Sequence, residues 1–312
     1  MALVLEVSNL RVEYGKFVAV PNLALELGAG HLLGLIGPNG AGKTTTLKAI
    51  AALLPRAAGS IKMLGEEVEA GRPQTLSRIG FAPDTAAVYE ELSVADFLRF
   101  IGRAYRLSRS MIEERIDYWL EQLWLSDRRE AKIKSLSRGM RQRLTVARTL
   151  LPDPVLVLLD EPAAGLDPAG RVQFRRLLGS LADSGKALIV SSHILADLDE
   201  YCTHVAIMQG GFILRHGTVA QIVGGKQDDR CRYDLTLSAA MPGLDRLLGS
   251  FPSVMQAQID GRQISFEYEN DPQAAADLLR ALVNRGVPVA SFGPRAHDLE
   301  QAYLRTGIRQ VD

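Results

Sequence analysis

Short, unbroken apolar runs alternate with segments of helical periodicity along the first two thirds of the chain. Three runs end in polar clusters: HLLGLIG leads into PNGAGKTTT, PVLVLLD into EPAAGLDP, and KALIVSS into His193. Such runs are typical of strands buried on both faces. Helical patterns lie between them, in TTTLKAIAALL before Pro55 and in GRVQFRRLLGSLADSG up to Gly185. This order predicts a parallel sheet, at whose carboxyl edge the three clusters form one site.

Two further patterns flank this predicted core. Residues 1–30 alternate in short β-like stretches, ALVLEVSNLRVEY and FVAVPNLALEL, around a Tyr-Gly turn signal, which predicts a small antiparallel sheet. From about residue 84 to 150 the pattern is helical, through VADFLRFIGRAYRL, MIEERIDYWLEQLWL and GMRQRLTVARTLL. We therefore expect a helical subdomain inserted into the α/β core.

The pattern changes after the glycine-rich and charged segment GGKQDD at 224–229, which predicts a linker. Beyond it we expect the order βαββαβ, with a hairpin turn at Asp260-Gly261 and a helix that Asp271 caps and Pro272 begins. The closing helix is expected in HDLEQAYLRTG. This order predicts a small ferredoxin-like α+β domain over residues 225–312, after a first domain over residues 1–224.

Composition narrows the class of protein. The 312 residues contain 36 Lys plus Arg and 36 Asp plus Glu, and this balance disfavours a nucleic-acid-binding protein. No apolar run approaches the roughly 18 residues of a membrane span, and MALVLEV lacks the basic start of a secretory signal. Cys202 and Cys231 make no disulfide framework, and Cys202 near His204 favours core packing over a metal site. We expect a soluble, cytoplasmic chain.

A phosphate-binding loop is predicted where the first apolar run ends. GPNGAGKT fits the pattern G-x-x-x-x-G-K-[ST] between a strand and a helix; a glycine-rich turn by chance is the alternative. The glycines let backbone N–H groups face a polyphosphate, Lys43 reaches its β- and γ-phosphates, and Thr44 ligates Mg²⁺. The residues predicted to bind nucleotide here are Gly37, Pro38, Asn39, Gly40, Ala41, Gly42, Lys43, Thr44 and Thr45.

Two carboxylates follow the second apolar run. Asp160 is expected to hold Mg²⁺ at the strand end, and Glu161 to face an attacking water as general base. The alternative for Glu161 is a role in capping the turn before Pro162. His193, at the end of the third run, is expected beside the γ-phosphate as a further catalytic residue.

A basic stretch between residues 132 and 148, KIKSLSRGMRQRLTVAR, raises the possibility of a nucleic-acid-binding helix. Its segment LSRGMRQRL instead resembles the signature of ATP-binding-cassette (ABC) transporter ATPases, usually LSGGQ or LSGGM. With GPNGAGKT, LLDEP, GLDP and His193 in order, the resemblance covers about residues 1–220. It implies an α/β fold of the P-loop NTPase (RecA-like) type, with ATP and Mg²⁺ as cofactors. It also implies a head-to-tail dimer, in which one signature closes over the γ-phosphate held by the other subunit.

The residues suit that role. Ser137 offers a hydroxyl, Gly139 lets the backbone approach closely, and the helix that follows contributes its dipole. The basic residues supply a positive rim, and Met140, Leu144, Ala147 and Leu151 form an inward stripe. A duplex-binding helix needs no serine–glycine turn at its start, so the nucleic-acid interpretation is rejected.

Further positions follow from the resemblance. Tyr14, in VEYGKF, matches the aromatic residue that stacks on adenine, with a plain β-sheet tyrosine as the alternative, and Asp167 matches the residue that signals between the two sites. Two positions depart from the family. Arg138 stands where glycine is commonest, which implies a change in how closely the dimer shuts. Asp84 replaces the usual glutamine that contacts Mg²⁺ and the water; this shorter, charged side chain would hold the metal through a water.

The resemblance implies an ATP hydrolase subunit, paired as a homodimer or heterodimer on the inner face of the membrane beneath separate permease subunits. The segment AAVYEELSVADFL matches the region that receives the permease. The ending DLEQAYLRTG resembles cassettes of drug, lipid and polysaccharide exporters, which favours export. The added domain would help dimerisation or regulation, or serve only in packing. The alternatives are a non-transport cassette ATPase that acts on ribosomes or another assembly, and a nucleotide-gated binding protein without useful turnover.

Overall fold

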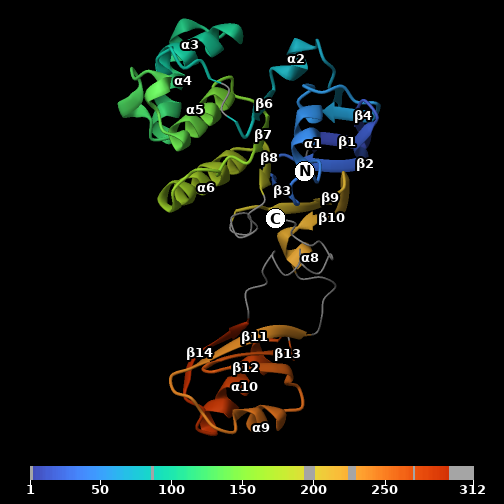
Figure 1. The fold of residues 1–312 in the computed structure, drawn as a ribbon, viewed down its shortest axis with the longest axis vertical. Helices are drawn as coiled ribbons and strands as arrows, with labels where there is room; N and C mark the ends of the chain where they lie inside the picture. The colour runs from blue at the N-terminus through green and yellow to red at the C-terminus, as the bar shows by residue number, and fades with distance from the viewer. Residues whose placement is uncertain (1–2, 86–87, 193–200, 224–229, 270, 295–312) are drawn as a thin grey trace. The chain divides into compact units, whose positions relative to one another are not determined.

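A computed structural model describes residues 3–85, 88–192, 201–223, 230–269 and 271–294 (Figure 1). The chain divides between Ile222 and Val223 into two compact units. The first, called unit 1, contains the described residues up to Ile222, and the second, called unit 2, includes the described residues from 230 to 294. The closing helix predicted in HDLEQAYLRTG lies outside the described residues.

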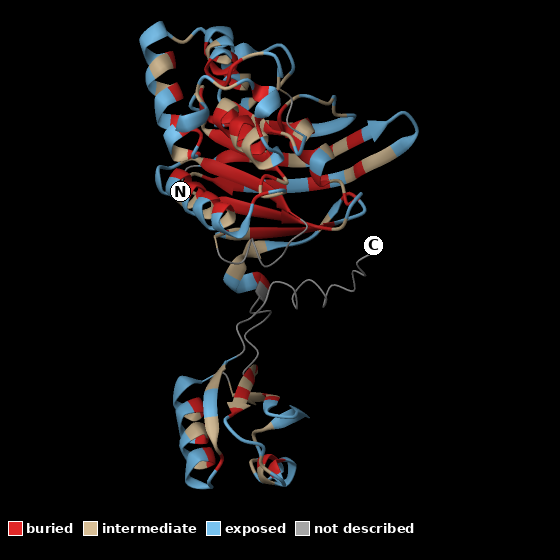
Figure 2. Cartoon of the chain, turned by 60° about the vertical axis from the view of Figure 1, so that its left-hand side comes forward, coloured by how far each residue is buried: buried red, intermediate tan, exposed pale blue. Residues whose placement is uncertain are grey.

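The core of unit 1 is a six-stranded sheet of order β10-β9-β3-β8-β7-β6. Its strands are β3 (Leu32–Ile36), β6 (Ile79–Ala82), β7 (Leu156–Asp160), β8 (Ala187–Ser192), β9 (His204–Gln209) and β10 (Phe212–Thr218). All neighbours pair in parallel except β9 and β10, which form an antiparallel hairpin. Every residue of β3, β7 and β8 is buried, as Figure 2 shows in red. The predicted parallel core is confirmed, because apolar strands of this kind need cover on both faces.

Two helices cover the parallel sheet from different sides. Helix α1 (Lys43–Ile50) contacts β7 and also the strands of the second sheet, whereas α6 (Pro168–Asp183) contacts β3 and β8 (Figure 1). Helix α1 ends earlier than the run TTTLKAIAALL suggests, because Ala52 already has a left-handed backbone (φ 54°). The carboxyl ends of β3, β7 and β8 remain beside the start of α1.

The second sheet of unit 1 is antiparallel, with order β2-β1-β4-β5. Its strands are β1 (Leu3–Tyr14), β2 (Phe17–Gly28), β4 (Ala58–Met63) and β5 (Glu66–Glu67). Buried residues of this sheet, of α1 and of the parallel strands pack into one core cluster. The predicted antiparallel sheet is confirmed, and it extends beyond residues 1–30 to include β4 and β5.

Three helices occupy the region where a helical insertion is expected: α3 (Val94–Ala104), α4 (Arg109–Gln122) and α5 (Arg138–Leu150). Each begins after a serine, because Ser93, Ser108 and Ser137 each accept a hydrogen bond from a backbone N–H in the first turn. The short helix α2 (Pro73–Leu76) precedes β6, and the 3₁₀ turns Ser126–Arg128 and Ile133–Ser135 lie between α4 and α5. Helix α8 (Val219–Val223) follows β10.

Unit 2 contains four strands and two helices in the order βαββαβ. They are β11 (Arg230–Leu237), α9 (Leu244–Gly249), β12 (Met255–Asp260), β13 (Gln263–Glu269), α10 (Pro272–Asn284) and β14 (Val289–Pro294). The strand order β12-β13-β11-β14, with all pairs antiparallel, is that of a ferredoxin-like fold. Alternate residues of β11 are buried in an apolar cluster that includes Phe266 and Leu282. The ferredoxin-like prediction is confirmed.

One detail of unit 2 differs from the prediction. Asp260 pairs with Gln263, so the two turn residues of the β12–β13 hairpin are Gly261 and Arg262, not Asp260 and Gly261. Gly261 carries the positive φ (59°) that the turn needs. The predicted cap of α10 is confirmed: Asp271 accepts a hydrogen bond from Ala274 N at 2.8 Å, and Pro272 is the first helical residue.

Candidate functional site

The glycine loop connects β3 to α1 with backbone angles and close contacts that favour glycine over residues with a side chain. Gly40 and Gly42 have positive φ angles of 80° and 100°, and Gly42 is the residue that precedes the first turn of α1. A Cβ on Gly37 would stand 2.4 Å from Met208 O. The loop therefore forms as predicted for a phosphate cradle, with the N-terminus of α1 at its end.

The β9–β10 hairpin supports this loop from one side. Besides the close approach of Gly37 to Met208, Gly211 N donates a hydrogen bond to Ala41 O at 2.9 Å. The hairpin contains no predicted site residue, yet it fixes where the loop begins and where it turns.

Lys43 lies folded back over the loop. Its Nζ donates hydrogen bonds to Gly37 O at 2.7 Å and Pro38 O at 3.3 Å, and it lies 3.9 Å from Glu161 Oε1. Burial lowers the pKa of the Lys43 ammonium below its ordinary value, while Glu161 and Asp160 act in the opposite direction. A cation in such a position gains from an incoming polyanion, because the protein alone does not compensate its desolvation.

Asp160 is completely buried at the end of β7, and both of its carboxylate oxygens accept hydrogen bonds. Thr44 Oγ1 donates to Oδ2 at 2.7 Å, and Ser191 Oγ donates to Oδ1 at 2.5 Å. The register pairs Asp160 with Ser191 across β7 and β8. The structure thus brings together two of the three predicted metal-binding residues, Thr44 and Asp160, through a direct hydrogen bond.

Glu161 leaves the strand in a left-handed conformation, with φ 48°. Few residues other than glycine adopt this conformation without strain. Its N–H donates to Ser191 Oγ at 3.0 Å, which holds the turn while the side chain lies partly exposed near Lys43. Asp160 and Glu161 therefore face different surroundings, as two carboxylates with different tasks require.

Ser191 is the site residue that the sequence analysis missed. Its hydroxyl donates to Asp160 and accepts from Glu161 N, so one buried side chain sets the position of both acidic residues. The signal in the sequence was present, because the third apolar run ends in two serines next to His193. His193 itself lies outside the described residues.

Tyr14 lies at the mouth of the loop. Its side chain is 47% exposed, and its hydroxyl is 3.5 Å from Thr45 Oγ1. An exposed aromatic ring beside the phosphate loop provides a surface on which a base could stack. The structure thus places Tyr14 and Thr45 together, on the side of α1 that faces the antiparallel sheet.

The serine–glycine turn stands at the start of α5. Ser137 is exposed and accepts a hydrogen bond from Met140 N at 3.3 Å. A Cβ on Gly139 would stand 2.9 Å from Gly165 O, so a larger residue there would push the turn away from the loop that follows Glu161. Asp167, at the end of the same loop, accepts a hydrogen bond from Gly170 N at 2.8 Å and caps α6. The turn and this loop are thus in direct contact within one chain.

Asp84 follows β6, and its Oδ1 accepts a hydrogen bond from Thr85 N at 2.6 Å. Among the described residues, no hydrogen bond joins it to Thr44 or Asp160. The segment that follows is tied to the stretch before α5, since Ile133 N donates to Leu92 O and Lys134 N donates to Glu90 O. These bonds fix residues 90–92 to the stretch that leads into the serine–glycine turn.

The residues present fit a nucleotide with a hard metal ion. The cradle has no room for a Cβ at Gly37, and the donor pair Thr44 and Asp160 consists of oxygen atoms, which Mg²⁺ prefers. In the part of the chain that the structure describes, no three His, Cys, Asp or Glu side chains gather as a metal cluster. A magnesium ion here would thus depend on phosphate and water for its remaining ligands.

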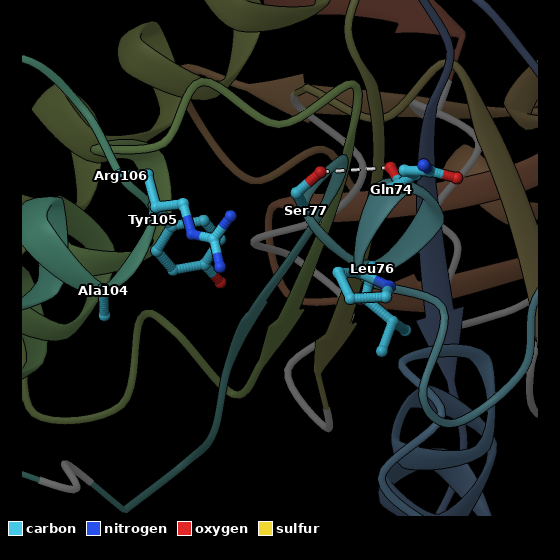
Figure 3. A pocket seen from close by; sticks show the side chains of 7 residues that line it. Gln74, Leu76, Ser77, Ala104, Tyr105 and Arg106 are labelled. Atoms are coloured by element: carbon cyan, nitrogen blue, oxygen red, sulfur yellow. Dashed lines mark hydrogen bonds between the residues drawn. The ribbon is translucent and has the colours of Figure 1, made fainter.

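A separate cavity of about 630 Å³ lies between α2 and the end of α3 (Figure 3). Gln74, Leu76 and Ser77 line one side, and Tyr105 and Arg106 line the other. None of these residues belongs to the predicted nucleotide site. None of the helices that the structure describes combines the length and apolar character of a membrane span.

Comparisons with known proteins agree with this geometry. The family model described as ABC transporter matches residues 20–164. The Nod factor export ATP-binding protein I of Cupriavidus metallidurans is 38% identical over 312 residues, covering 100% of this chain and 99% of that protein. The linearmycin resistance ATP-binding protein LnrL of Bacillus subtilis is 31% identical over 214 residues, covering 69% of each chain.

A solved structure described as the ATP binding subunit of an ABC transporter superposes with a TM-score of 0.66 at 30% sequence identity. The match covers 70% of this chain and 91% of that chain.

Proposed function

Because the chain belongs to the ABC transporter family as an ATP-binding subunit, we propose that it works as one half of a dimer and energises export through separate permease subunits. ATP hydrolysis coupled to transport is the activity of this family.

For the hydrolytic role of this site, the arrangement around Ser191 is the strongest support. It holds Asp160 between two hydroxyl groups and turns Glu161 out of the strand, next to the Lys43 ammonium. In our proposal Thr44 and Asp160 would hold Mg²⁺, which would neutralise phosphate charge when bound. Glu161 then takes the proton of the attacking water, and His193, which follows β8 in the sequence, orients the reacting group.

The glycine loop and Lys43 bind the β- and γ-phosphates. Backbone N–H groups and the N-terminus of α1 supply fixed dipoles, and the Lys43 ammonium supplies charge where solvent is excluded. Tyr14 stacks on the base, with Thr45 beside it. The protein groups thus hold ATP at both ends. Asp84 would contribute to the metal site through a water molecule.

A dimer completes the site. Ser137 and Gly139 lie at the start of a 13-residue helix, α5, whose dipole favours an anion. The glycine loop leads into a different helix, α1. We propose that these residues cap the nucleotide of a second, identical subunit, and that Asp167 transmits the state of one site to the other. Nucleic acid plays no part in this scheme.

Export is the direction that the relatives support. Proteins named for Nod factor export and for linearmycin resistance are similar to this chain. We propose that the subunit acts on the inner face of the membrane, where residues 86–98 receive the permease and unit 2 assists dimerisation. Copurification from solubilised membranes should yield a multi-span partner, whereas ribosomes would indicate a non-transport ATPase.

The decisive experiment replaces Glu161 with Gln. Loss of a general base typically reduces turnover at least about 100-fold, while ATP binding should persist and trap an ATP-bound dimer. Rapid kinetics and size-exclusion chromatography with ATP measure both effects, and Glu121→Gln, an exposed change on α4, is the control. Normal hydrolysis by Glu161→Gln would refute the assignment.

A further inference from the structure

Arg138 is a cation in a position where a helix disfavours one. It is the first residue of α5, at the positive end of the helix dipole, and the first turn contains no acidic residue. Arg141 lies on the next turn, where Glu90 pairs with it at 2.7 Å. Among the described residues, Arg138 has no ion pair. The free chain therefore carries the positive charge of Arg138 at this helix end without a counter-charge from the described residues.

The side chain of Arg138 is nevertheless supported along its stem. Its Cγ, Cδ and Nε lie 3.5–3.6 Å from the point where a Cβ on Gly165 would stand. Gly165 has φ 81° and belongs to the loop between Glu161 and Asp167. The aliphatic part thus lies against this loop, which limits the positions that the exposed guanidinium can reach.

We propose that Arg138 binds the terminal phosphate of the ATP molecule held by the partner subunit. This rests on the proposed head-to-tail dimer, and it adds a charged group to the Ser137 hydroxyl and the backbone of the turn. A guanidinium stays protonated at any working pH and forms two parallel hydrogen bonds with phosphate oxygens. Phosphate brought to this helix end removes the charge conflict that the free chain carries.

Three replacements separate charge from packing. Arg138→Met keeps a stem of similar length over Gly165 and removes the charge, Arg138→Lys keeps the charge, and Arg138→Gly removes both. A charge-assisted hydrogen bond is worth roughly a tenfold change in affinity. We expect Arg138→Met to raise the KM for ATP about tenfold, Arg138→Lys to restore most of the loss, and unfolding curves to stay unchanged for both.

Mixed dimers test whether Arg138 acts across the interface. Two differently tagged copies are coexpressed, one of them with Lys43→Ala so that it holds no nucleotide, and the mixed dimer is isolated through both tags. If Arg138 acts on the partner's ATP, Arg138→Met should impair hydrolysis when it shares a chain with Lys43→Ala. It should have no added effect on the other chain, because its phosphate partner is then the empty loop.

The same mixed dimers with Ser137→Ala distinguish a wrong role for Arg138 from a wrong head-to-tail dimer. If Ser137→Ala follows the cross-subunit pattern and Arg138→Met leaves KM unchanged, the role of Arg138 is wrong and the dimer stands. If Arg138→Met impairs only its own chain's site, the role is also wrong. If Ser137→Ala shows no cross-subunit pattern, the head-to-tail dimer fails and the inference fails with it.

Discussion

The two units of this chain fill their interiors differently. Among the described residues of unit 1 ten buried ones are polar or charged, and Lys43, Asp160 and Ser191 lie at the carboxyl edge of the parallel sheet. In the described residues of unit 2 every buried side chain is apolar, a cysteine or a tyrosine, and the four rings of Tyr233, Phe266, Tyr268 and Phe292 pack against one another. Burying polar groups costs free energy unless each finds a partner. The contrast indicates that the interior of unit 1 holds polar side chains for a functional site, whereas the interior of unit 2 serves apolar packing.

Removing a central ring should give the largest effect and stay within unit 2. Phe266 is completely buried, and Phe266→Ala should lower the free energy of unfolding of unit 2 by about 3–5 kcal/mol. Calorimetry should show one transition moving and the transition of unit 1 unchanged. Val283→Ala, at a side chain 53% exposed, is the control. If both transitions fall together, the units are one cooperative structure and the contrast is lost.

The second-largest effect should come from removing one hydroxyl group, and it should be confined to unit 1. Ser191→Ala leaves Asp160 Oδ1 and Glu161 N without their buried partner, and an unsatisfied buried group costs about 1–3 kcal/mol. We expect unit 1 to lose stability by that amount and ATP turnover to fall, as measured by melting and steady-state kinetics. Ser265→Ala, on β13 of unit 2, should change neither. Unaltered turnover in Ser191→Ala would mean that the two carboxylates are positioned by other contacts.

Two aspartate caps offer a closely matched comparison. Asp167 begins α6 in unit 1 and Asp271 begins α10 in unit 2, each followed by proline and each bonded to a backbone N–H at 2.8 Å. Alanine at either should cost about 1 kcal/mol of helix stability. Only Asp167→Ala should also impair ATP hydrolysis. Equal effects on hydrolysis would indicate that the Asp167 loop has no role beyond capping.

The smallest effect is a dependence on pH confined to unit 1. Burial lowers the pKa of His204, and His31, stacked on it at 4.1 Å between ring centroids, and His216 lower it further. A lowered folded pKa gives stability that is present above about pH 6.5 and lost as pH falls through the lowered value. Glu26 of β2 acts in the opposite sense on His216, whose own pKa burial lowers.

Melting curves between pH 7 and pH 5 should therefore show unit 1 weakening on acidification. The sequence of unit 2 contains one histidine, His297, against four in unit 1, so its transition should move less in this range. His204→Phe keeps a ring beside His31 and should reduce the pH dependence of unit 1. An equal response of both transitions would contradict this origin.

The sequence predicted most of the architecture because its signals are local. Uniform apolar runs identified β3, β7 and β8, the fixed glycine spacing identified the loop, and Asp271-Pro272 located the start of α10. The sequence did not predict the long-range features. The bonds of Ser191 depend on register between β7 and β8, and β4 joins β1 across more than forty intervening residues. In the β12–β13 hairpin, pairing of Asp260 with Gln263 moved the turn by one residue.

The support of the glycine loop by Met208 and Gly211 has a consequence for shortened versions of this protein. A fragment that stops at Ser192 would retain every motif residue before His193. Its phosphate loop would nevertheless lose the contacts that Met208 and Gly211 make with it. The minimal nucleotide-binding piece should therefore extend through β10. The boundary of a fragment that binds nucleotide is therefore set by the strands that support the motif, not by the position of the last motif residue.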